Sequence, residues 1–135
     1  MKDMNVCAIS PTSVINMEPG HPSILCVDDS EEILLICQTI LEADGYQVLT
    51  ASSAPQALEL LQMHSVDAAV IDNLMPGMNG IALAREIKKL ASGVRVILFS
   101  SLERPDESVP FIDSYLSKGQ GPLALRKLIG LLLRR

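Results

Sequence analysis

Five polar residues of this sequence could perform chemistry together: Asp28, Asp29, Asp72, Ser100 and Lys118. Each stands at the end of a short apolar run or directly after one. Three carboxylates in one pocket repel one another unless a cation lies between them. A donor set of oxygens alone, without His or Cys, favours Mg²⁺, which readily takes phosphate oxygens to complete its octahedron. We therefore expect a Mg²⁺ site that binds a phosphoryl group.

One carboxylate of such a cluster remains available as a nucleophile. An aspartate beside Mg²⁺ can attack a phosphoryl group and become an aspartyl phosphate, while an ammonium and a hydroxyl help to neutralise the equatorial oxygens. Asp72, Lys118 and Ser100 supply the carboxylate, the ammonium and the hydroxyl. Taken singly these residues have ordinary explanations, because strand-end acids often cap helices and most lysines are merely exposed. The hypothesis of an aspartyl phosphate site rests on the occurrence of all these residues at strand ends of one sequence.

The elements that must bring these residues together alternate along the chain. Short apolar runs, typical of strands covered on both faces of a parallel sheet, alternate with segments of helical period. The expected strands are 24–27, 46–51, 67–72, 94–100 and 112–117. Four helices are expected, two after the caps Ser30 and Asn79 and two over 54–63 and 123–133, with a brief fifth at most between 101 and 110. The alternation predicts a doubly wound α/β fold, a five-stranded parallel sheet with helices on both faces. The polar residues then meet at the carboxyl ends of the strands.

The composition excludes several classes of protein. The chain has 135 residues, a formal net charge of −5 and 48% hydrophobic residues. A domain of this size can fold without disulfides, and Cys7, Cys26 and Cys37 are expected to be free reduced thiols. The sequence has no basic cluster for nucleic acid and no apolar run near the roughly 20 residues of a membrane helix. We expect a soluble, cytoplasmic protein with a flexible leader at 1–22 and one domain at 23–135, without nucleic acid or membrane as partner.

The most specific segment runs from Asp72 to Gly80, where a strand-end carboxylate precedes a Pro-Gly turn and an Asn cap. With the acidic pair, Ser100, Tyr115 and Lys118, this D-x-x-M-P-x-M-x-G pattern resembles the receiver domains of bacterial two-component response regulators. The resemblance covers about residues 23–133. It implies the flavodoxin-like receiver fold of chemotaxis-type proteins.

The resemblance also implies a role for each site residue. Asp72 would be phosphorylated by a histidine kinase or a histidine phosphotransfer protein. Four residues would bind Mg²⁺: Asp28 through water, Asp29, Asp72 and the backbone carbonyl of Leu74. Ser100 would turn toward the phosphoryl group and Tyr115 would follow it, reshaping the surface near the fourth helix and the fifth strand for an unknown downstream protein. The implied reactions are self-phosphoryl transfer and self-dephosphorylation, and the protein would not be an enzyme acting on other substrates.

Three features depart from the family pattern. Gly119 follows the lysine, where members usually carry a proline. The interval 100–118 looks short and contains two prolines, so helix four is expected to be shortened or absent. Leu74 and Leu102 stand where the family tunes hydrolysis of the phosphoryl group, and apolar side chains there cannot orient water. We therefore expect slow self-dephosphorylation.

Several functions stay open at the level of sequence. The leading hypothesis is a stand-alone receiver, which relays phosphoryl groups or docks on a partner when phosphorylated. One alternative is a receiver-fold binding module that acts independently of phosphorylation, and another is a receiver fragment of a larger regulator or hybrid kinase. A Mg²⁺-dependent phosphohydrolase is also conceivable, although its usual strand-one nucleophile motif and cap domain are missing.

Overall fold

A parallel β-sheet forms the centre of the computed structural model, which describes residues 21–73, 75–77, 79–101 and 110–133. Within these residues the sheet has five strands: β1 (Ser23–Val27), β2 (Gln47–Ala51), β3 (Ala68–Ile71), β4 (Arg95–Ser100) and β5 (Ser114–Ser117). Their order is β2-β1-β3-β4-β5, and every neighbouring pair is parallel. The predicted doubly wound α/β fold is confirmed, and its strand order reverses beside β1.

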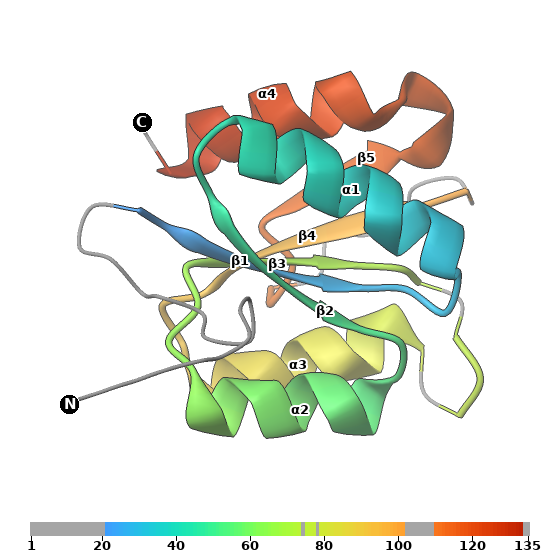
Figure 1. Ribbon diagram of the computed structural model, residues 1–135. Coiled ribbons are helices and arrows are strands. Elements are labelled where there is room, and N and C mark those ends of the chain that lie inside the picture. Colours follow the sequence, from blue (N-terminus) through green and yellow to red (C-terminus); the bar gives the residue numbers. More distant parts are fainter. Residues whose placement is uncertain (1–20, 74, 78, 102–109, 134–135) are drawn as a thin grey trace, which may run out of the picture.

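Helices cover both faces of this sheet. Figure 1 shows α1 (Glu31–Ala43) and α4 (Pro122–Leu133) on one face, and α2 (Ala54–Met63) and α3 (Gly80–Leu90) on the other. The segment 102–109, where a shortened or absent helix four was expected, lies outside the described residues, and so does most of the expected leader 1–22. None of the described helices has the length and apolar character needed to cross a bilayer.

Side-chain caps fix where three helices begin. The Ser30 hydroxyl accepts a hydrogen bond from the Ile33 N–H of α1 at 3.3 Å, and the Ser53 hydroxyl accepts one from Gln56 of α2 at 3.3 Å. At α3, the Asn79 side chain accepts from the Ala82 N–H at 2.7 Å. Each cap satisfies a backbone donor that the helix itself leaves unpaired. The predicted caps Ser30 and Asn79 are both confirmed.

The sheet separates two apolar clusters. Successive residues of a strand point to opposite faces, so Leu25 packs toward α2 and α3, while Ile24 packs toward α1 and α4. Both side chains are fully buried. Their fully buried partners include Leu83 and Ile87 on the α3 side, and Leu125 on the α4 side. This packing on both faces fixes the strand ends, where the charged residues emerge.

The fifth strand is shorter than predicted. The expected strand 112–117 begins only at Ser114, because Asp113 makes a different set of contacts. Its carboxylate accepts the Val96 N–H at 2.7 Å and the Lys88 ammonium at 2.9 Å, and its own N–H donates to the Val96 carbonyl at 2.8 Å. Asp113 therefore joins β4, α3 and the entry to β5.

Candidate functional site

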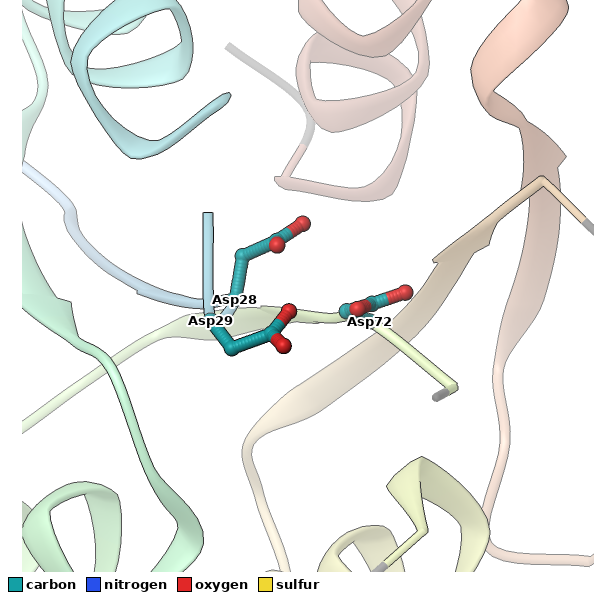
Figure 2. A group of neighbouring side chains, drawn as sticks. All are labelled: Asp28, Asp29 and Asp72. Atoms are coloured by element: carbon teal, nitrogen blue, oxygen red, sulfur yellow. The ribbon is translucent and has the colours of Figure 1, made fainter. Parts of the chain in front are cut away.

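Three carboxylates meet at the carboxyl edge of the sheet, between β1 and β3. Asp28 and Asp29 follow β1 directly, and Asp72 follows β3 (Figure 2). One oxygen of each lies within 4.8 Å of one oxygen of each of the others. Asp28 and Asp72 are 4% and 6% exposed, whereas Asp29 is open to solvent. The cluster thus has two buried carboxylates and one exposed carboxylate at its mouth.

Main-chain bonds extend the strand ladder as far as these acids. The Asp28 N–H donates to the Ala51 carbonyl of β2 at 3.1 Å, and the Asp72 N–H donates to the Val27 carbonyl of β1 at 2.9 Å. The Ser30 N–H donates to Asp28 Oδ1 at 2.9 Å. The backbone positions of the two buried carboxylates are therefore set by the central strands.

Lys118 lies beside these carboxylates, although it follows β5 at the far side of the sheet from β2. Its Nζ lies 2.8 Å from Asp28 Oδ2 and 3.3 Å from Asp72 Oδ1. Partial burial lowers the pKa of Lys118, but the hydrogen bond to Asp28 and the charges of Asp28 and Asp72 outweigh burial, so the pKa lies above its ordinary value. Lys118 therefore stays an ammonium at neutral pH and offsets part of the repulsion between the acids.

The donor set fits a hard divalent cation. Its three carboxylates offer oxygen ligands only, and the exposed side of the cluster leaves room for the waters that Mg²⁺ keeps. An acidic triad of this kind is typical of a Mg²⁺ site in receiver domains. Leu74, whose carbonyl was expected to be a further ligand, lies outside the described residues, as does Leu102.

Ser100 and Tyr115 lie on the two strands beyond β3. Ser100 is the last residue of β4, is 6% exposed and pairs in register with Ser117 of β5. Tyr115 of β5 pairs in register with Leu98 and packs against the apolar cluster on the α2 and α3 side. The structure thus places Ser100 at the same edge of the sheet as the acids, and Tyr115 two residues back from that edge.

Gly80 has a steric role that the sequence reasoning missed. A Cβ atom at Gly80 would lie 2.5 Å from the Asp72 carbonyl oxygen, 2.9 Å from Asn73 Cα and 3.0 Å from Leu98 Cδ1. The Gly80 N–H also donates to the Asn73 carbonyl at 2.9 Å. The first turn of α3 therefore packs directly on the main chain of Asp72. A glycine at the first position of a helix, where most residues are tolerated, is the signal that could have revealed this contact.

Two thiols lie beneath the acidic cluster. Cys26 of β1 and Cys37 of α1 are free and buried, and with Asp28, Asp72 and other residues they line a cavity of about 10 Å³. Burial, with a smaller contribution from the Asp28 charge, raises the pKa of Cys37 to about 11. Buried neutral thiols of this kind are poor nucleophiles, so they act as packing residues below the site.

The strand order and the acidic cluster together define a flavodoxin-like receiver fold. The chain belongs to the response regulator receiver domain family, whose model matches residues 24–129. The members of this family are not enzymes in the usual sense.

Two curated relatives illustrate the similarity. The probable transcriptional regulator ycf27 of Cyanidium caldarium is 34% identical over 116 residues, which cover 83% of this chain and 46% of that protein. The response regulator SaeR of Staphylococcus aureus is 32% identical over 116 residues, covering 83% of this chain and 50% of SaeR. This chain spans about half the length of these curated relatives.

Solved structures agree with this assignment. A CheY-like receiver domain of Methanospirillum hungatei is 30% identical with a TM-score of 0.79, covering 85% of this chain and 95% of that one. The response regulator TrrA of Thermotoga maritima, solved in complex with Mg²⁺ and BeF, is 29% identical with a TM-score of 0.76, covering 82% and 98%. TrrA in complex with the histidine kinase ThkA also matches, at 27% identity and a TM-score of 0.75, covering 83% and 98%.

Proposed function

We propose that this chain is a phosphoacceptor domain in which Asp72 receives a phosphoryl group from a histidine kinase or a histidine phosphotransfer protein. The observation that carries the proposal is the Lys118 ammonium, which lies 2.8 Å from Asp28 and 3.3 Å from Asp72. An ammonium beside a buried carboxylate and two further acids suits a site where anionic oxygens and a divalent cation meet. The TrrA structures, one with Mg²⁺ and BeF and one with a kinase, support the same reading.

In this proposal, Asp29, Asp72 and the Leu74 carbonyl bind Mg²⁺ directly, and Asp28 binds through water. Both oxygens of Asp28 already accept hydrogen bonds, Oδ1 from the Ser30 N–H and Oδ2 from Lys118, which favours an indirect role. When bound, Mg²⁺ supplies positive charge that offsets repulsion between the carboxylates and the incoming phosphoryl oxygens.

The proposed transfer uses the carboxylate of Asp72 as nucleophile. One of its oxygens attacks the phosphorus of a phosphohistidine, so a P–O bond forms while the P–N bond breaks. The electron pair of the broken bond stays on the imidazole nitrogen, which takes up a proton from solvent. Lys118 neutralises charge on the phosphoryl oxygens, and the Ser100 hydroxyl donates a hydrogen bond to one of them. Tyr115 then responds to the movement of Ser100, and the surface around β4 and β5 changes for a downstream protein.

A direct test uses a small phosphoryl donor. Purified protein is incubated with Mg²⁺ and acetyl phosphate and analysed by intact-mass spectrometry. The wild type should gain the mass of one phosphoryl group, and Asp72→Asn or removal of Mg²⁺ with a chelator should abolish the gain. Asp67→Asn is the matched control, because Asp67 directly precedes the same strand at its opposite edge. It should be labelled like the wild type.

Two results would contradict the proposal. Labelling that persists in Asp72→Asn would show that another residue is the acceptor. Folded wild-type protein that never gains mass would favour a binding module that acts independently of phosphorylation. Repeated turnover of a phosphate monoester, lost in Asp72→Asn, would instead indicate a phosphohydrolase.

A further inference from the structure

The turn that carries Lys118 lacks the residue that usually restricts it. Gly119 follows the lysine, at the position where the receiver pattern has a proline. Proline fixes its own φ and restricts the residue before it, whereas glycine has the widest backbone freedom of any residue. A lysine that precedes glycine gains no direction from its neighbour. Lys118 nevertheless points between Asp28 and Asp72.

Side-chain hydrogen bonds hold this turn from both sides. Lys118–Gln120 form a single 3₁₀ turn that begins at Ser117. The Ser117 hydroxyl accepts the Gly119 N–H at 3.1 Å, and the Gln120 side-chain carbonyl accepts the Ser117 N–H at 3.3 Å. This reciprocal arrangement is a capping box, which satisfies two backbone donors and fixes the entry to the turn.

The ends of the turn are also fixed. Ser117 is the last residue of β5 and pairs in register with Ser100. On the other side, the Gly121 N–H donates to the Lys118 carbonyl at 3.1 Å, and Gly121 has φ +88°, a conformation that favours glycine. The helix α4 starts at the next residue, Pro122. The capping box therefore fixes the backbone of the turn that connects β5 to α4.

We propose that Ser117 and Gln120 are positioning residues for Lys118, which take over the restriction that proline gives other receivers. The inference rests on the proposed function of the site, because it assigns to Lys118 the contact with the phosphoryl group. Lys118 is a cation beside the acids, so losing the capping box should weaken binding of a phosphoryl group without weakening Mg²⁺ binding.

The test measures two affinities for each variant by NMR amide shifts. The first is for Mg²⁺ alone, and the second is for beryllofluoride, a phosphoryl mimic, at saturating Mg²⁺. Gln120→Ala and Ser117→Ala should each weaken beryllofluoride binding by about fivefold, the effect expected for loss of one cap. Gln120→Glu and Ser117→Thr keep the acceptor oxygens and should bind like the wild type. Gln38→Ala removes another exposed glutamine hydrogen bond, to Glu42 at 3.2 Å, and should change neither affinity.

A double-mutant comparison separates positioning from general stability. In a Lys118→Ala background, Gln120→Ala should cause no further loss, because the group that it positions is gone. A further loss of similar size, or an unchanged affinity in both single variants, would overturn the positioning role. Failure of the wild type to bind beryllofluoride, or binding that survives Asp72→Asn, would overturn the proposed function together with the inference built on it. The results for the wild type and Asp72→Asn thus distinguish the two failures.

Discussion

The close approach of α3 to Asp72 makes Gly80→Ala a sharp test of the site's architecture. The added methyl group would lie 2.5 Å from the Asp72 carbonyl oxygen, about 0.9 Å inside the 3.4 Å at which ordinary contact begins. Two of its three near neighbours are backbone atoms, of Asp72 and Asn73, which cannot rotate away as a side chain can. The first turn of α3 and the main chain of Asp72 must therefore move apart.

The expected cost follows from two opposing effects. Overpacking a core by one methyl group costs about 1–3 kcal/mol, and the fixed backbone places this case near 3 kcal/mol. Alanine is a better helix former than glycine by about 1 kcal/mol, which offsets part of the loss. The free energy of unfolding should therefore fall by about 2 kcal/mol, which corresponds to a drop of about 8 °C in Tm for a domain of this size.

Urea unfolding of Gly80→Ala and Gly130→Ala, followed by circular dichroism, measures this difference. Gly130 is the matched control, because it also lies in a helix, α4, and a Cβ there would meet nothing within 4 Å. Its replacement by alanine should raise the free energy of unfolding by about 0.5–1 kcal/mol. Mg²⁺ binding should weaken in Gly80→Ala, since the Asp72 backbone shifts, and stay unchanged in Gly130→Ala. If both variants gained stability equally, the close packing of α3 on Asp72 would be refuted.

Four further predictions concern stability, thiol reactivity, pH dependence and the acidic cluster. Asp113→Ala leaves the Val96 N–H without its carboxylate partner and should lower the free energy of unfolding by about 2 kcal/mol in urea titrations, more than Asp113→Asn. In a Cys7→Ser background, Cys37 should react with iodoacetamide at pH 8 about 100-fold more slowly than a free thiol, because its pKa is raised from 9.0 to about 11, and the rate should rise in urea. The same pKa shift stabilises the folded state below pH 9, where the thiol is neutral in both the folded and the unfolded chain, and this contribution is lost as the pH rises toward 11. The free energy of unfolding of the wild type should therefore fall between pH 9 and 11. A Cys37→Ser variant with the same pH dependence as the wild type would contradict this assignment. Asp29→Asn removes one of three repelling carboxylates, so calorimetry should show a higher Tm without Mg²⁺ and a smaller increase when Mg²⁺ is added.

Local signals in the sequence were sufficient to predict most of the fold. The bounds of α2 agree at both ends with the prediction 54–63, because Ser53 caps its start and its polarity pattern ends at Met63. The strands were less well bounded, since an apolar run does not reveal where the hydrogen-bonded ladder stops. At β5, the side chain of Asp113 replaces a ladder partner, which is a tertiary contact that no local pattern encodes.

The convergence of the site was predictable for a similar reason. Parallel strands end at one edge of the sheet, so the residues after β1, β3 and β5 had to lie near one another. The direct packing of Gly80 on Asp72 was not predictable, because it depends on how closely α3 approaches the sheet. The sequence also left open how Lys118 is aimed without a following proline, since that depends on hydrogen bonds between Ser117 and Gln120 across the turn.

The ion pair between Lys118 and Asp28 has a consequence for folding. The two residues are 90 positions apart, and Lys118 follows β5, which lies at the edge of the described sheet and pairs with β4. Closing a contact over such a large sequence separation costs more chain entropy than closing a local one, so the contact is favoured once the intervening chain is ordered. The acids of β1 and β3 can therefore come together before the ammonium arrives. Docking of β5 is thus the step that brings a positive charge to the two buried carboxylates, and it couples the electrostatics of the site to completion of the sheet.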